Sequence, residues 1–153
     1  MNKFSFKILA EVHSEEIFLL QNNNLDDFGK NIWKTDELKK SIKENVFEGH
    51  VFIYKEKING FCFFKKIDDF IEIYSLFVVQ ECRKKGVAKN LLECCVKYCE
   101  KNNLRRIILD VNENNLHAIK FYKKHDFFLS GRRKDYYRNK ESFNDSFTMC
   151  KLV

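Results

Sequence analysis

The first part of the chain combines one alternating apolar pattern with two helical patterns. Residues 4–8 place apolar side chains at every second position, which is the period of a half-buried strand. Ser14 can cap a helix that runs through Glu15 and Glu16 into the apolar residues 17–20, and apolar side chains at steps of four over 35–46 predict a second helix. Thr35 is expected to cap the second helix, because its hydroxyl can accept a hydrogen bond from the first turn, and Gly49 is expected to end it.

The middle of the chain carries three apolar runs that are separated by turn residues. The runs over 51–54 and 61–64 flank an Asn-Gly dipeptide at 59–60, which predicts an antiparallel hairpin that turns at this dipeptide. An Asp-Asp pair at 68–69 marks a second turn. The apolar run that follows, over 71–79, is long enough for a strand in the centre of a sheet.

The pattern becomes helical again after a polar, basic turn at 80–86. Apolar side chains then recur at steps of three and four over 88–99, which predicts a helix directly after the turn. The next run, over 107–111, is short and nearly all apolar, as is typical of a strand that is covered on both faces.

The last part of the chain predicts one more helix and two closing strands. The helix is expected to begin near Ala118 and to end near Asp126. The strands are expected over 127–129 and 147–152, around a charged segment that contains tyrosines. No linker, repeat or low-complexity tract divides the sequence, so residues 1–153 are expected to form one α/β (α+β) domain.

The composition agrees with a globular protein of this size. Hydrophobic residues make up 44% of the 153 residues and charged residues 33%, which excludes an intrinsically disordered chain. No apolar run approaches the roughly 18 residues of a membrane span, and the N-terminal residues alternate rather than form a secretory signal. We therefore expect a cytoplasmic protein without a membrane partner.

The net charge of +6 is distributed unevenly along the chain. Residues 81–140 hold 16 Lys and Arg against 7 Asp and Glu, a net charge of +9, and the remainder has a net charge of −3. The basic segment indicates an anionic partner, although a solvated basic surface would give the same count.

The cysteines and histidines predict neither a metal site nor thiol chemistry. The six cysteines include no C-x-x-C pair, and in a reducing compartment they are expected to be free thiols that pack in the core. The four histidines form no recognisable metal-binding or catalytic-triad spacing.

The basic turn has the features of a phosphate-binding loop. It connects a central strand to a helix, and the N-terminus of a helix presents free N–H groups and a partial positive charge. Gly86 allows close approach of a ligand to the backbone, and Arg83, Lys84 and Lys85 surround it with positive charge. By itself this pattern is also compatible with a solvated helix cap.

The flanking residues extend the pattern to a known family. Arg83, Gly86 and Ala88 resemble the acyl-CoA pyrophosphate loop of the GNAT superfamily of N-acetyltransferases. The strand residues 76–78 and the segment from Asn115 to Tyr122 resemble two further blocks of that family, in the same order. The resemblance covers nearly the whole chain.

The resemblance implies a fold and a set of cofactor-binding residues. The fold is the GNAT fold, a single mixed central sheet of about seven strands flanked by about four helices. The co-substrate implied is acetyl-CoA, with no metal. The residues implied to bind it are Leu76, Phe77, Val78, Arg83, Lys84, Lys85, Gly86, Val87, Ala88, Lys89 and Asn115.

Within this superfamily the sequence most resembles the RimI-type protein N-terminal alanine acetyltransferases. The run from Leu109 through Tyr122 and the element that contains Arg133, Tyr136 and Tyr137 match theirs. Trp33 matches a tryptophan of that group, although the proline that precedes it there is missing. By this resemblance Trp33, Tyr136 and Tyr137 bind the acceptor; each of them is also of a type that commonly packs in a core.

The resemblance and acid–base chemistry together imply direct transfer of an acetyl group to a free amine. An α-amino group has an ordinary pKa of about 8, against about 10.4 for lysine, so one carboxylate can suffice as general base. Asp110 occupies the position of the base, with one methylene fewer than the Glu of the RimI pattern, and Glu113 is the alternative base. Tyr122 matches the tyrosine that protonates the departing thiolate. Asp110 could instead only bind loop N–H groups, and Tyr122 could be a core residue.

The acceptor implied is the N-terminal α-amine of a protein, with a small-subunit ribosomal protein as the family's associated partner. A first alternative keeps the fold and changes the acceptor to a small amine or a lysine side chain. A second is a non-catalytic acyl-CoA- or RNA- and ribosome-binding module, since the basic segment would also suit nucleic acid. The aromatic residues form no stacking platform, so direct nucleic-acid binding is not expected.

Overall fold

The computed structural model describes residues 3–29, 31–138 and 143–153, and side chains outside 134–144. Seven strands form one mixed sheet in the order β1-β2-β3-β4-β5-β7-β6. β4 and β5 run parallel, and the other neighbouring pairs run antiparallel. The strands are β1 Phe4–Ile8, β2 Glu48–Tyr54, β3 Lys57–Ile67, β4 Phe70–Val78, β5 Arg106–Asn112, β6 Phe128–Arg138 and β7 Phe143–Leu152.

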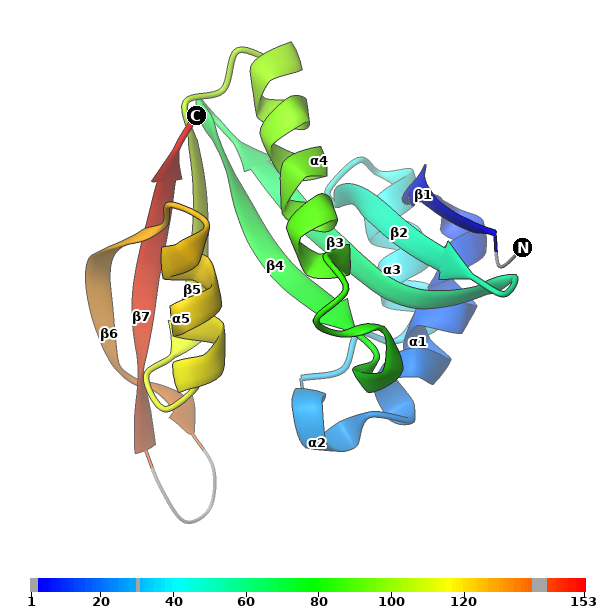
Figure 1. Ribbon diagram of the computed structural model, residues 1–153, viewed down its shortest axis with the longest axis horizontal. Coiled ribbons are helices and arrows are strands. Elements are labelled where there is room, and N and C mark those ends of the chain that lie inside the picture. The colour runs from blue at the N-terminus through cyan, green and yellow to red at the C-terminus, as the bar shows by residue number, and fades with distance from the viewer. Residues whose placement is uncertain (1–2, 30, 139–142) are drawn as a thin grey trace.

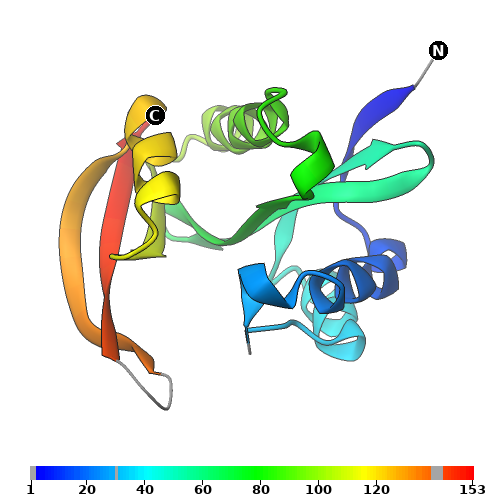
Figure 2. The same cartoon turned by 60° about the horizontal axis from the view of Figure 1, so that its bottom comes forward.

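Helices cover both faces of the sheet. They are α1 Ser14–Asn22, α2 Leu25–Phe28, α3 Thr35–Lys43, α4 Val87–Lys101 and α5 Leu116–Lys124. Figure 2 shows α4 and α5 on one side of the sheet and α1, α2 and α3 on the other. The central strand β3 is buried from both sides, and its Phe61, Phe63 and Phe64 are fully inaccessible to solvent. The expected mixed sheet of the GNAT fold is therefore confirmed.

The parallel strands β4 and β5 separate part-way along their length (Figure 1). Their pairing ends at Ile73 and Leu109, after which β4 continues against β3 and β5 continues against β7. At this point the β3–β4 register shifts, and Tyr74 is the extra residue on β4. Such a bulge bends a strand and increases its local twist, which carries the end of β4 away from β5. The sheet is thereby split, and the backbone of β4 after Tyr74 faces the split.

The predicted β2–β3 hairpin exists, but its turn was predicted wrongly. The chain reverses at Lys55 and Glu56, both with positive φ, and not at the Asn-Gly dipeptide. Asn59 is the extra residue in a register shift, and its side-chain amide donates to the carbonyls of Tyr54 and Lys57. Gly60 pairs with Phe52 inside the sheet.

Three other predicted boundaries also differ from the structure. Lys34, not Thr35, is the N-cap of α3, and its N–H donates to the Glu37 carboxylate at 3.2 Å. Gly49 lies in β2, where a Cβ would come within 2.0 Å of the Cys62 carbonyl oxygen, so it is required by strand packing and does not end a helix. The one-turn helix α2 was not predicted, and the closing strands include most of the charged segment between them.

Candidate active site

The loop between β4 and α4 places an open helix N-terminus at the wide end of the split. After Val78 the chain makes a short 3-10 turn, and α4 begins at Val87 with Gly86 as its N-cap. Gly86 has a φ of +80°, which favours glycine, and no atom lies within 4 Å of the position of a Cβ. The first N–H groups of α4 lack intrahelical acceptors by geometry, so the loop offers donors beside open space.

The basic residues of the loop have different partners. Arg83 braces the loop: its Nε donates to the Val78 carbonyl at 2.8 Å, its guanidinium pairs with Asp27 of α2 at 3.1 Å, and it lies over the Phe77 ring. Lys85 donates to the carbonyl of Glu81. Arg83 therefore connects the end of β4 to α2.

The remaining predicted cofactor residues of this loop lie around the same N-terminus. Lys84 and Lys89 are exposed, and Lys89 lies 3.9 Å from Glu93. Val87 is buried in the core and Ala88 is half-buried against it, so these two can offer a ligand their backbone more readily than their side chains. The predicted loop residues are thus brought together at one end of α4.

The predicted strand residues Leu76, Phe77 and Val78 form the last part of β4. Phe77 and Val78 are buried, and Leu76 is half-buried. Because β4 has left β5 before these residues, their backbone lies along the split.

Asp110 lies on β5 just beyond the last residue that pairs with β4. Its side chain is 11% exposed, and Thr148 donates its hydroxyl to Oδ1 at 2.7 Å. The Arg133 guanidinium lies 3.4 Å from Oδ2. Ile107 lines a groove beside α4, and side chains alternate along a strand, so Asp110 faces the opposite side of the sheet.

Glu113, the alternative base, has a separate set of partners. Its carboxylate accepts from Arg132 at 2.8 Å and from the backbone N–H of Asp145 at 3.3 Å. Arg132 also pairs with the Asp145 carboxylate at 2.7 Å. Arg132 pairs with Phe147, which pairs with Val111, so Arg132 and the Glu113 carboxylate that it binds lie on the α4 and α5 side of the sheet, opposite Asp110.

Tyr122 lies in α5, and Asn115 lies directly before it. Tyr122 packs edge-on against Phe127 and against Phe121, with ring centroids 5.4 and 5.3 Å apart. Asn115 is the N-cap of α5, and its side-chain oxygen accepts from the Ala118 N–H at 3.1 Å. Asn115 therefore has a structural role whether or not it also contacts a cofactor.

The model of the Acetyltransferase (GNAT) family matches residues 16–127 of this sequence. The chain belongs to this family. It is an acetyltransferase.

Relatives of this GNAT protein agree with that assignment. A Bacillus subtilis protein named as a ribosomal protein bS18-alanine N-acetyltransferase is 27% identical over 106 residues, 69% of this chain and 70% of that protein. An N-alpha-acetyltransferase of Saccharolobus solfataricus is 31% identical over 96 residues, 60% of this chain and 56% of that protein.

Solved structures show the same fold over nearly the whole chain. The ribosomal-protein-S18-alanine N-acetyltransferase of Escherichia coli has a TM-score of 0.82 at 17% identity, covering 99% of this chain and 94% of that one. Arabidopsis thaliana NAA60 in complex with acetyl-CoA has a TM-score of 0.84 at 20% identity, covering 99% of both chains.

The predicted acceptor residues of this GNAT domain are only partly described. Trp33 exchanges two backbone hydrogen bonds with the buried Gln21 amide. Its ring packs edge-on against Phe47, Phe63 and Tyr74, the bulged residue of β4. Trp33 is therefore part of an aromatic cluster that reaches the split. The side chains of Tyr136 and Tyr137 lie outside the described residues, although both residues belong to β6.

The cysteines are free, and five of the six are buried. Burial raises the pKa of the Cys99 thiol to about 12, so this thiol stays protonated at neutral pH. The described residues contain no group of three His, Cys, Asp or Glu side chains that could hold a metal ion. In the same described part, no helix combines the length and the apolar character needed to span a membrane.

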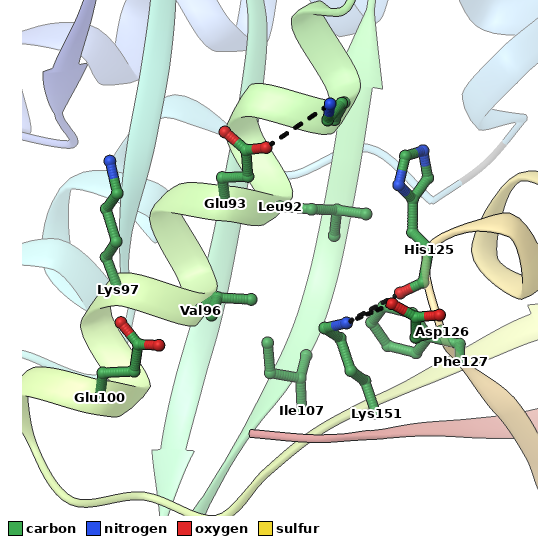
Figure 3. A pocket seen from close by; sticks show the side chains of 11 residues that line it. Leu92, Glu93, Val96, Lys97, Glu100, Ile107, His125, Asp126, Phe127 and Lys151 are labelled. Atoms are coloured by element: carbon green, nitrogen blue, oxygen red, sulfur yellow. Dashed lines mark hydrogen bonds and ion pairs between the residues drawn. The ribbon is translucent and has the colours of Figure 1, made fainter.

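A groove of about 400 Å³ beside α4 was not predicted from the sequence (Figure 3). Leu92, Val96, Ile107 and Phe127 supply its apolar lining, and charged residues surround them. Lys151 also lines the groove and donates to the His125 carbonyl at 3.0 Å. The groove begins at the first turn of α4, and its other lining residues come from β5, from the segment after α5 and from β7. Because these parts are far apart in sequence, no local pattern could have revealed it.

Proposed function

We propose that this GNAT protein transfers the acetyl group of acetyl-CoA directly to the N-terminal α-amine of a protein. The observation that carries the proposal is the position of Asp110: a nearly buried carboxylate at the split, on the face opposite the phosphate-binding loop. The names of the Bacillus and Saccharolobus relatives support an N-terminal amine as the acceptor.

The residues around the split fit acetyl-CoA. The open space at Gly86 and the free N–H groups of α4 suit a pyrophosphate, with Lys84, Lys85 and Lys89 near it. The β4 backbone at 76–78 suits the amides of an extended pantetheine arm. When bound, acetyl-CoA supplies a thioester carbonyl and a thiolate leaving group.

Two residues on opposite sides of the sheet are proposed to carry out the two proton transfers of the reaction. Asp110 accepts the proton of the acceptor ammonium at Oδ2, which leaves a lone pair on the amine nitrogen. This step needs little driving force, because the ordinary pKa of an α-amine is about 8. Tyr122, on α5 and on the other side of the sheet, donates its Oη proton to the departing thiolate. Trp33, Tyr136 and Tyr137 are proposed to contact the acceptor, and Asn115 the cofactor.

A small amine is the second candidate acceptor, and one observation favours it. Streptothricin acetyltransferase A of Bacillus subtilis is 29% identical over 73 residues, 48% of this chain and 42% of that protein. If the acceptor is a protein N-terminus, we propose a small-subunit ribosomal protein as the partner, because the name of the Bacillus subtilis relative gives ribosomal protein bS18 as its acceptor.

The test is acetylation of a panel of acceptors, read by mass spectrometry. The panel contains peptides that differ at their first residue and the same peptides with blocked N-termini. It also contains peptides with an unmodified lysine side chain, and small polyamines. We expect acetylation of free N-termini, strongest for a small first residue. Acetylation confined to lysine or to small amines would replace the proposed acceptor, and acetylation of none of them would favour a non-catalytic binding module.

A further inference from the structure

The two oxygens of Asp110 are held in different ways. Thr148 is the direct partner of Asp110 in the β5–β7 ladder, which places both side chains on the same face of the sheet. The bond from the Thr148 hydroxyl to Oδ1 is 2.7 Å long. Its length and its fixed strand register make Oδ1 the anchored end of the carboxylate.

Arg133 approaches the other oxygen from β6. It pairs with Ser146 of β7, so its guanidinium reaches over β7 to Oδ2, at 3.4 Å. Charge-assisted hydrogen bonds are commonly about 2.7–2.9 Å long, so this contact is loose. The Arg133 side chain is 54% exposed, whereas that of Asp110 is only 11% exposed. A nearly buried carboxylate is costly to leave without a counter-charge, so the guanidinium leaves Oδ2 readily only when another cation takes its place.

We propose that Thr148 positions Asp110 through Oδ1, and that Arg133 occupies Oδ2 until the ammonium of the acceptor replaces it. The inference rests on the proposed role of Asp110 as general base. Exchange of one cation for another keeps the carboxylate charge balanced before and after the acceptor binds. Thr148 is thus a positioning residue, and Arg133 sets how strongly an acceptor must bind.

The neighbouring Arg132 supplies a matched control. It pairs with Glu113 and Asp145 and lies over the Phe147 ring, on the other side of the sheet from Asp110. Arg132→Gln removes the same charge from the same strand without touching Asp110.

The positioning role is tested with Thr148→Val, which keeps the shape of the side chain and removes the hydroxyl. We expect kcat to fall about tenfold to hundredfold, as for a general base that has lost its orientation, with both KM values unchanged. Thr148→Ser should restore kcat. Ser130→Ala, which removes a bond to the Thr148 carbonyl only, should leave kcat unchanged. A Thr148→Val enzyme with wild-type kcat, or a loss that Ser does not restore, would overturn the positioning role.

The exchange is tested with Arg133→Gln and a peptide acceptor that has a free N-terminal alanine. We expect the KM for the peptide to fall about twofold to fivefold, because the cation that competes for Oδ2 is lost, while kcat is unchanged. Arg133→Lys and Arg132→Gln should keep the wild-type KM. An unchanged or increased KM in Arg133→Gln would overturn the exchange.

Asp110→Asn separates this inference from the proposed function. If Asp110→Asn retains full activity on every amine, Asp110 is not the base and the proposed function fails in its mechanism. If Asp110→Asn is inactive but the Thr148 and Arg133 variants equal wild type, the further inference alone is refuted.

Discussion

Gly86→Glu tests whether the N-terminus of α4 binds the phosphates of acetyl-CoA. Gly86 has a φ of +80°, and a Cβ there would meet no atom within 4 Å. The substitution therefore has two separable effects, a backbone cost in the folded protein and a negative charge beside the proposed pyrophosphate.

The structure allows both magnitudes to be estimated. A side chain in the left-handed region costs about 1–2 kcal/mol of unfolding free energy, with no steric term added. A carboxylate about 5 Å from a phosphate charge makes the binding free energy of acetyl-CoA about 1–3 kcal/mol less favourable. This range corresponds to effective dielectric constants between that of water and that of a protein surface. The dissociation constant of acetyl-CoA should then increase about fivefold to hundredfold.

The assay is calorimetric titration with acetyl-CoA, together with thermal unfolding of the same samples. Gly86→Ala should lose stability without a comparable loss of affinity, because it lacks the charge. Gly29→Glu is the matched control, since Gly29 also has a positive φ, +57°, and equally open surroundings. The ψ of Gly29, −124°, lies outside the left-handed region, so Gly29→Glu should lose at least as much stability as Gly86→Glu and still keep wild-type affinity. Wild-type affinity in Gly86→Glu would refute the assignment of the phosphate site.

Four further outcomes are expected. Tyr122→Phe should reduce kcat about hundredfold while acetyl-CoA affinity by calorimetry is retained, because only the proton donor is lost. Asp110→Asn should abolish most turnover in a steady-state assay, and Glu113→Gln should not, because Glu113 pairs with Arg132 on the other face. Gly49→Ala should lower the free energy of unfolding, measured in urea, by about 3 kcal/mol through overpacking against the Cys62 carbonyl. Burial lowers the pKa of His50, so unfolding takes up a proton below a pH of about 6.5. Stability should therefore fall as the pH drops through that value and stay level above it, and His50→Gln should lessen the slope.

Local patterns were sufficient for most of the elements and for the glycine-containing turn before α4. A strand, a turn with one glycine and an amphipathic helix are neighbours in sequence, so their spacing alone predicts α4 and the loop before it. The Asn-Gly hairpin turn failed for a physical reason. The Asn59 side-chain amide donates to the carbonyls of Tyr54 and Lys57, and Gly60 pairs with strands on both sides. These contacts within the sheet therefore outweighed the turn preference of the dipeptide.

The sequence also left open on which side of the sheet each of the two candidate bases lies. Asp110 and Glu113 are three residues apart, and either could reach a substrate in an unfolded chain. The β5–β7 register places Asp110 beside Thr148, whereas Glu113, just after β5, binds Arg132 of β6 on the other face of the sheet. A register between strands that are distant in sequence carries this information, and no local spacing contains it.

By itself, then, the sequence of this protein determined a GNAT domain, the basic turn before α4 and two candidate bases. These depend on short-range periodicity and on a family pattern. Only the tertiary structure decided where β4 leaves β5, which residues Arg83 binds, and which oxygen of Asp110 is anchored. Each of these depends on side chains that meet only when β4, β5, β6, β7 and α2 are assembled.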